Sequence, residues 1–255
     1  MSELIKTNAL VIHSTRWSES SKIAELFTSD LGHLKVIAKG ALRSKSDFRG
    51  TLESFNYIEA VISKRDSRGL QILSSATLLN SFLQIRYDVN KLGIGFSILE
   101  LIRNFFKSHE PSRPFFEYLV QCFISLAESN NQNIKIYLWH FLLNLSLVLG
   151  FEWTFDRCLN CQQIPNTEKI FLDYKNARIL CNNCKRITDA EFNLVLTPET
   201  WSTVQILNSS NVKDLDSLMM PDEIASKIDL TGMLLKHLSY HTDDPIELKS
   251  LRWYG

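Results

Sequence analysis

The sequence predicts an α+β protein in which a small five-stranded barrel is followed by helices and a cysteine-rich insertion. β-branched apolar runs fill the first eighty residues, and the apolar period becomes helical after them. Four cysteines then gather in two C-x2-C pairs between helices. We therefore expect a multidomain chain, with a barrel domain at 1–80 and a helical domain at 81–255 that contains a metal-binding insertion at 152–190.

The strands are predicted from five short apolar runs that polar turn segments separate. These runs cover residues 7–13, 22–28, 34–39, 55–63 and 70–79. Five short strands within eighty residues suit a small closed barrel. Alternation in the third run predicts that Leu34, Val36 and Ala38 face the core and that Lys35 and Lys39 face solvent.

Three amphipathic segments predict the first helices of the second domain. Their apolar stripes are Leu92, Phe96, Leu99, Ile102 and Phe106, then Phe116, Leu119, Phe123 and Leu126, then Ile134, Leu138, Phe141, Leu145 and Val148. Pro114 opens the second helix and Gly150 ends the third. Thr197 is expected to cap a helix that begins at Pro198, and another helix is expected to open at Pro221.

The charge of the chain is balanced in total and uneven in distribution. There are 28 basic and 28 acidic residues, but residues 1–80 hold 11 basic and 8 acidic ones. Such asymmetry favours a nucleic-acid surface on the barrel. The longest apolar stretch, residues 137–151, is shorter than the ~20 residues that a membrane span needs. Because the first residues lack the apolar core of a secretory signal, we expect a cytoplasmic protein without membrane contact.

The clearest chemical motif is the set Cys158, Cys161, Cys181 and Cys184. Two C-x2-C pairs separated by 19 residues fall within the spacing of a four-thiolate zinc site, with a short hairpin expected between them. The alternatives are disulfides or buried thiols, and disulfides are disfavoured in a cytoplasmic protein. A closed set of four sulfurs leaves no position for substrate, so we expect one structural Zn²⁺. Cys122 is predicted to be a core residue.

A basic strand and loop form the second candidate site. With one strand lysine, the loop supplies five cations: Lys35, Lys39, Arg43, Lys45 and Arg49. Ser44 and Ser46 add hydroxyl groups for phosphate oxygens, and Phe48 is a candidate for stacking on a base. A solvated loop kept polar for solubility remains the alternative.

Motifs of the common catalytic sites are missing from the sequence. There is no phosphate-binding P-loop, no nucleophile elbow and no zinc-protease helix, so we expect no enzyme activity. His140 is interpreted as a core or groove residue, and His237 and His241 as one helix face. The five tryptophans and fifteen phenylalanines are interpreted mainly as packing residues.

Short strings along nearly the whole chain match a known family in the same order. They lie at residues 9–13, 18–23, 26–28, 38–41, 43–46, 51–55, 196–199 and 248–250, with the paired cysteines following Phe151. In these strings the chain resembles the RecO family of bacterial recombination mediators. The resemblance implies an N-terminal OB-fold, a C-terminal helical domain and a zinc-binding insertion.

The same resemblance implies a function. Members of the RecO family bind single- and double-stranded DNA and anneal complementary strands coated with single-stranded DNA-binding protein (SSB). With RecR they help to load RecA onto SSB-coated DNA, in the bacterial cytoplasm and at the nucleoid during repair. The residues that inherit the DNA role are Lys35, Lys39, Arg43, Lys45 and Arg49, with Arg16 and Lys22 as weaker additions.

Two further expectations concern protein partners. The C-terminal tail of SSB is expected to dock in the helical domain, where Arg103 and Lys107 are candidates. The alternative function is a zinc-stapled scaffold that binds proteins and makes no direct contact with DNA.

Overall fold

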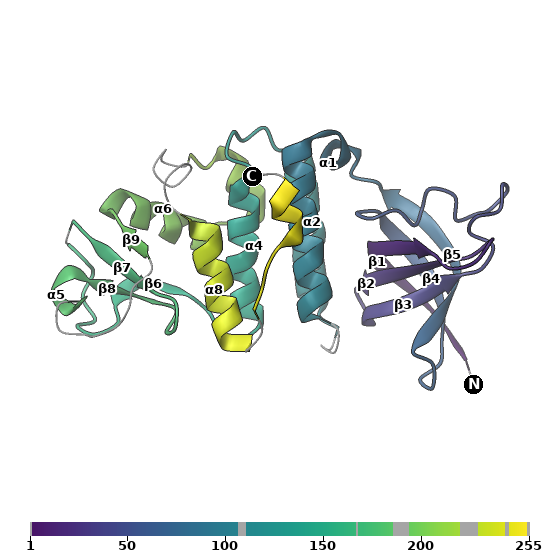
Figure 1. The fold of residues 1–255 in the computed structure, drawn as a ribbon, viewed down its shortest axis with the longest axis horizontal. Helices are drawn as coiled ribbons and strands as arrows, with labels where there is room; N and C mark the ends of the chain where they lie inside the picture. Colours follow the sequence, from purple (N-terminus) through teal and green to yellow (C-terminus); the bar gives the residue numbers. More distant parts are fainter. Residues whose placement is uncertain are drawn as a thin grey trace. The chain divides into compact units, whose positions relative to one another are not determined.

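A computed structural model of the chain describes residues 2–106, 111–166, 168–185, 194–219, 229–242 and 245–253. These residues form two compact units (Figure 1). Unit 1 joins Met1–Glu128 to Leu248–Gly255, and unit 2 is Ser129–Glu247. Unit 1 thus combines the barrel with the helices that follow it, and the division into domains at 1–80 and 81–255 stays a prediction.

Unit 1 begins with a closed barrel of five strands in the order β1-β2-β3-β5-β4 (Figure 1). The strands are β1 (Glu3–Arg16), β2 (Lys22–Thr28), β3 (Gly32–Ala38), β4 (Tyr57–Lys64) and β5 (Leu70–Asn80). β1 is longer than predicted because its first half pairs with β4 and its second half with β2. A short parallel pairing between β3 and β5 closes the barrel, so the predicted five-stranded barrel is confirmed.

The barrel core follows from alternation along each strand. Val36 and Ala38 on β3 are fully buried, as are Ile58, Ala60 and Ile62 on β4. At full burial a Val or Ile side chain contributes about 1.5–3 kcal/mol to folding. On β3, Lys35 is exposed as predicted and Ile37 is partly exposed, while Leu34 packs against the core and is partly buried.

Three helices follow the barrel in the described part of unit 1: α1 (Leu83–Tyr87), α2 (Val89–Phe105) and α3 (Arg113–Glu128). The Asp88 carboxylate caps α2 by accepting hydrogen bonds from the amides of Asn90 and Lys91. The predicted stripe of α3 is buried in full. The predicted apolar stripe of α2 is only partly correct, because Phe96 is partly exposed while Ile94 and Ile98 are buried.

The reason for this difference is that α2 has several neighbours. It packs on α1 and α3, and it also contacts the C-terminal helix η2 (Lys249–Trp253) and the barrel. A single stripe cannot serve all these contacts. The Glu100 carboxylate accepts hydrogen bonds from the amides of Lys249 and Ser250 and from the Ser250 hydroxyl, which fixes the end of the chain to unit 1.

Unit 2 is built around α4 (Lys135–Val148), which is buried on most of its surface. The other helices among its described residues are α5 (Asn182–Lys185), α6 (Pro198–Ser209), η1 (Val212–Ser217) and α8 (Leu230–Thr242). Thr197 caps α6 as predicted, accepting a hydrogen bond from the Thr200 amide. The predicted helix start at Pro221 lies outside the described residues.

A four-stranded sheet in unit 2 has the order β6-β8-β7-β9 (Figure 1). Its strands are β6 (Thr154–Cys158), β7 (Ile170–Asp173), β8 (Arg178–Cys181) and β9 (Leu194–Leu196). β7 and β8 form the hairpin expected between the cysteine pairs. The ring of His237 on α8 lies between the carbonyl oxygens of Tyr174, in the hairpin turn, and Phe151, at 2.6 and 2.8 Å.

Across the described ranges, we find no helix with the length and apolar character that crossing a membrane requires.

Candidate metal centre and nucleic-acid interface

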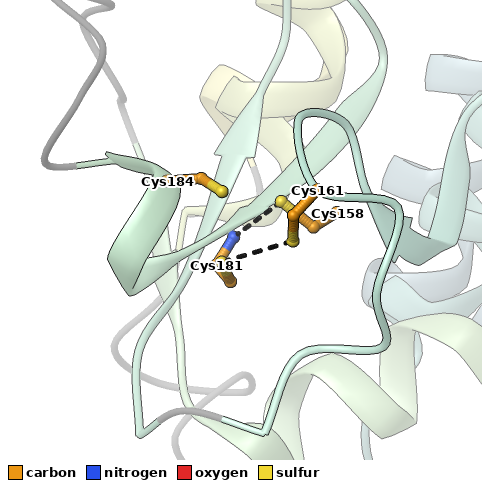
Figure 2. Close-up of side chains that lie close together, drawn as sticks. All are labelled: Cys158, Cys161, Cys181 and Cys184. Carbon is orange, nitrogen blue, oxygen red and sulfur yellow. Dashed lines mark hydrogen bonds between the residues drawn. The ribbon is translucent and has the colours of Figure 1, made fainter.

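The four cysteines of the insertion converge on one point. Cys158 ends β6, Cys181 ends β8, Cys161 lies in the turn after β6, and Cys184 lies on α5. Their sulfur atoms all lie within 4.8 Å of one another. Figure 2 shows the side chains of Cys158 and Cys161 facing those of Cys181 and Cys184 across a small space. The parallel pairing of β6 with β8 brings the two C-x2-C pairs to the same end of the sheet.

The spacing of the sulfurs fits a tetrahedral metal ion. Zinc–sulfur bonds of about 2.3 Å place neighbouring sulfurs about 3.8 Å apart, and the Sγ atoms of Cys161 and Cys181 are 3.9 Å apart. All five cysteines of the chain are free of disulfides. The cluster is therefore close enough to bind one metal ion, and the predicted convergence of the four cysteines is confirmed.

The local electrostatics favour a thiolate at Cys158. Burial raises the pKa of this thiol, but the backbone amides of Cys161, Cys181 and Asn160 together outweigh burial and lower the pKa to about 6. The Cys181 amide lies 3.4 Å from the Cys158 sulfur. The thiolate is the form that binds a metal.

The pKa of Cys184 is shifted in the opposite direction when no cation is bound. Burial and the neighbouring sulfurs raise its pKa to about 12, in spite of a hydrogen bond to the Asn160 side chain. Four sulfurs cannot all be ionised at this distance unless a positive charge stands among them. A bound metal ion supplies that charge and deprotonates its thiol ligands. Cys122 is different: it is buried on α3, with a pKa raised to about 12 by burial, as expected of a core thiol.

The second candidate site is the end of the barrel at which β1, β2 and β3 meet. Arg16 pairs with Lys22 across β1 and β2, and Lys22 pairs with Ala38 across β2 and β3. The chain continues from Ala38 to Lys39 and the β3–β4 loop. A hydrogen bond of 2.9 Å from the Leu42 amide to the Ser20 carbonyl joins this loop to the β1–β2 turn. We call this end of unit 1, residues 16–22 with 39–50, the basic end.

Most of the predicted DNA-binding residues lie exposed at the basic end. Those without an ion pair to any described residue are Arg16, Lys39, Arg43, Lys45 and Arg49. Lys22 is less free, because its ammonium group lies 2.8 Å from the Glu53 carboxylate and its side chain is only 21% exposed. These cations are available to phosphate groups without breaking an ion pair among the described residues.

Lys35 lies apart from the basic end, roughly 13 Å along the strand from Lys39 at about 3.3 Å per residue. Its ammonium group is 3.7 Å from the Glu25 carboxylate on β2. Glu25 is buried, and the Arg103 guanidinium on α2 donates two hydrogen bonds to it, at 2.9 and 2.8 Å. Burial raises the pKa of Glu25, but Arg103, Lys35 and His33 together lower it below its usual value.

This arrangement gives Arg103 a structural role that the sequence did not reveal. The guanidinium pairs with Glu25 and so fixes α2 to the barrel, while its role toward the SSB tail stays a prediction. Lys107, the other candidate, lies outside the described residues.

The β3–β4 loop is anchored to the barrel by apolar side chains. Ala41 and Leu52 belong to the barrel core, and Phe48 packs against the same core. The side-chain amide of Asn56 also donates hydrogen bonds to the backbone carbonyls of Gly50 and Thr51. Phe48 is therefore an anchor of the loop. It stays partly exposed and lines the pocket at this end of the barrel, so its interpretation as a stacking side chain stays a prediction.

A pocket of about 340 Å³ lies within the basic end. Its polar lining includes Lys22, Arg43, Arg49 and the hydroxyl residue Ser44. A concave surface with this lining suits a phosphate or a nucleotide.

One exposed aromatic residue at the basic end was missed. Trp17, in the β1–β2 turn, is 64% exposed and is an exception to the general interpretation of the aromatic residues as packing residues. Its position directly after Arg16, within a polar turn and outside any apolar alternation, is the sequence signal that could have identified it.

Comparison with known proteins accounts for almost the whole chain. A family model described as "Recombination protein O N terminal" matches residues 1–82, and one described as "Recombination protein O C terminal" matches residues 86–252.

Curated relatives carry the same name. A protein named DNA repair protein RecO from Caldicellulosiruptor bescii is 25% identical over 226 residues, which cover 89% of each chain. The protein of that name from Salinibacter ruber is 33% identical over 157 residues, 60% of this chain and 59% of the relative. The one from Chlorobium limicola is 31% identical over 156 residues, 61% of this chain and 59% of the relative. With two family models that together span residues 1–82 and 86–252, this chain belongs to the RecO family.

Proposed function

We propose that this protein is a DNA repair and recombination mediator that binds single- and double-stranded DNA through the basic end of its barrel. In this role it anneals complementary strands and, with RecR, assists the loading of RecA onto SSB-coated DNA. It works in the bacterial cytoplasm, at the nucleoid during repair, and catalyses no covalent reaction. Membership of a family whose relatives are named for DNA repair supports the general role.

The observation that carries the proposal is the group of exposed, unpaired cations at the basic end. A protein that anneals DNA without nucleotide hydrolysis must reduce the repulsion between two polyanions and leave the base edges free to pair. Cations that contact phosphates meet both requirements. The barrel adds an argument from architecture, because OB-folds bind oligonucleotides along strand faces and adjacent loops.

Zinc is the metal that we propose for the cysteine cluster. Four thiolates in tetrahedral spacing are typical of structural zinc, and such a site has no position for water or substrate. When bound, the ion would hold β6, β8 and α5 together at the end of the sheet. The lobe would then serve as a rigid part of unit 2 and would take no part in chemistry.

A scaffold that contacts only proteins is the second candidate. It is favoured by a run of exposed large apolar side chains at the end of β5 and on α1, namely Leu78, Leu79, Leu83 and Tyr87. Surfaces of this kind commonly mark protein interfaces. RecR and the apolar-tipped tail of SSB are partners whose contacts such a surface would suit.

The experiment that separates the two candidates is DNA binding as a function of salt. Fluorescence anisotropy with labelled single-stranded DNA would compare the natural chain with the triple variant Lys39→Ala/Arg43→Ala/Lys45→Ala. We expect the slope of log affinity against log salt to fall by roughly one unit for each lost phosphate contact.

The matched control is Arg157→Ala/Lys175→Ala/Lys213→Ala, which removes the same charge from exposed positions of unit 2. Its slope should stay that of the natural chain. An unchanged slope in the first triple variant would refute the assignment of the basic end, and absence of DNA binding at low salt would favour the scaffold.

A further inference from the structure

The exposed indole of Trp17 stands out among the four tryptophans whose side chains the structure describes. Trp139 and Trp153 are each 2% exposed and Trp201 is 9% exposed, whereas Trp17 is 64% exposed. The turn that carries it is well formed, because the amides of Trp17 and Ser18 both donate hydrogen bonds to the Ser21 carbonyl. The exposure of the ring therefore belongs to an ordered turn.

The position of Trp17 places the ring among cations. It directly follows Arg16, whose guanidinium donates a hydrogen bond of 3.2 Å to the Ser18 carbonyl and thereby stays beside the turn. Through the Leu42–Ser20 hydrogen bond, the same turn contacts the loop that carries Arg43. Trp17 thus lies at the basic end, directly after Arg16 and in a turn that is hydrogen-bonded to the loop carrying Arg43.

An aromatic face flanked by exposed cations matches the chemistry of a single nucleic-acid strand. The cations contact phosphates, while the indole offers a flat apolar surface of the kind on which an unpaired base stacks. In a duplex the bases already stack on one another, so the ring has no equivalent partner there. A protein partner would gain from the apolar ring but would leave the surrounding cations without counter-charges unless it were strongly acidic.

We propose that Trp17 is a base-stacking residue for single-stranded DNA. This inference rests on the proposed function, since it needs a strand bound at the basic end. Stacking uses the face of a base and leaves its pairing edge free, so a base on Trp17 can still meet its complement. Trp17 would hold a strand in a form ready for pairing without reading its sequence.

The test compares Trp17→Ala and Trp17→Phe with the natural chain, with fluorescence anisotropy as the readout. The ligands are a labelled oligothymidine, the same oligonucleotide with abasic sites in place of its bases, and a blunt duplex. We expect Trp17→Ala to weaken binding to oligothymidine by about fivefold or more, the lower bound for one stacked base. Trp17→Phe should recover most of this loss because it keeps an aromatic face.

Two readouts separate stacking from a general disturbance of the surface. The salt slope of Trp17→Ala should equal that of the natural chain, since no phosphate contact is removed. Its affinity for abasic DNA and for the duplex should also be unchanged. Tyr87→Ala is the matched control, because it removes another aromatic side chain of unit 1, 85% exposed on α1, and should leave all three affinities unchanged.

The outcomes distinguish this inference from the proposed function. Equal affinities of the natural chain and Trp17→Ala for oligothymidine would overturn the stacking role, while a flattened salt slope in the loop triple variant would leave the proposed function intact. An equal loss on abasic and normal DNA would also overturn it. Failure of the natural chain to bind any DNA would overturn both.

Discussion

The metal lobe and the basic end of the barrel are two candidate sites built on opposite principles. In the metal lobe, four side chains from β6, β8, α5 and a turn converge on one point, and three of the four are buried. At the basic end, five exposed cations are spread over the end of β1 and the β3–β4 loop, and two of them, Arg43 and Arg49, line the same pocket. A convergent site should fail as a whole when one member is removed, whereas a dispersed site should lose affinity in increments.

The largest effect is expected from breaking the convergent site. Cys181→Ser should abolish stoichiometric metal binding and unfold the lobe around residues 154–185, because structural zinc contributes on the order of 10 kcal/mol to the folding of small zinc domains. Native mass spectrometry would give the metal content, and hydrogen exchange would report the state of the lobe. Cys122→Ala is the control and should retain one metal ion per chain. A full equivalent of tightly bound metal in Cys181→Ser would contradict the account.

A smaller effect is expected where a single ion pair supports the barrel. Arg103→Ala leaves the buried carboxylate of Glu25 without its two strongest hydrogen bonds, so we expect a loss of about 1–3 kcal/mol in the free energy of unfolding. Urea unfolding followed by circular dichroism measures this loss. The control Lys64→Ala breaks an exposed pair with Asp66, 3.3 Å apart, and should cost at most about 1 kcal/mol. Equal losses in the two variants would show that Arg103 has no special role.

The pair Arg103–Glu25 also predicts a pH dependence. The pKa of Glu25 is lowered in the folded protein, so the unfolded chain binds its proton more readily. The contribution of Glu25 is therefore present above the unfolded pKa and is lost as the pH falls through the folded value. In Arg103→Ala this acid-dependent loss should be smaller than in the natural chain. An undiminished loss would contradict the assigned cause.

Single substitutions at the dispersed site should each have a modest effect. Lys39→Ala should lower the slope of log affinity against log salt by roughly one unit. Lys22→Ala should change it less, because Glu53 already neutralises this lysine. Conversely, Glu53→Gln should strengthen DNA binding by releasing Lys22. A larger effect from Lys22→Ala than from Lys39→Ala would show that ion pairing in the free protein does not determine how much each lysine contributes to DNA binding.

The smallest effect is expected from a buried histidine. Burial lowers the pKa of His140, although a hydrogen bond from the ring to the Ser210 carbonyl opposes this. The unfolded chain therefore takes up a proton first, and stability should decline as the pH falls below the unfolded value near 6.5. His140→Gln, which can keep the hydrogen bond without titrating, should show a weaker decline in urea midpoint between pH 7.5 and 5.5. A stability that rises on acidification would contradict this.

The sequence predicted the convergent site better than the dispersed one for a physical reason. Four cysteines at fixed spacings have few ways to satisfy their chemistry, so the local pattern alone indicated that Cys158 and Cys181 would meet. The barrel could likewise be predicted from the sequence, since alternation along β3 indicates which of its residues are buried. Strand pairing between Arg16, Lys22 and Ala38 is a long-range property, and no local pattern encodes it.

The surroundings of three side chains that the local sequence did not reveal have the same origin. Phe48 became a core anchor because the loop folds back on the barrel, and Trp17 became exposed because its turn projects beyond the last pair of β1 and β2. Arg103 was engaged by Glu25, which is 78 residues away in the sequence. Composition could indicate that cations and aromatic residues were present, but which of them remain free depends on tertiary contacts.

The central claim is that the basic end of the barrel brings DNA strands together. The most direct measurement follows the annealing of complementary strands coated with SSB, with and without the metal-loaded protein. The account predicts that the natural chain accelerates annealing and that Lys39→Ala/Arg43→Ala/Lys45→Ala does so much less, while the unit 2 control Arg157→Ala/Lys175→Ala/Lys213→Ala remains active. Annealing at the same rate with the natural chain as without protein, or with the loop variant as with the natural chain, would contradict it.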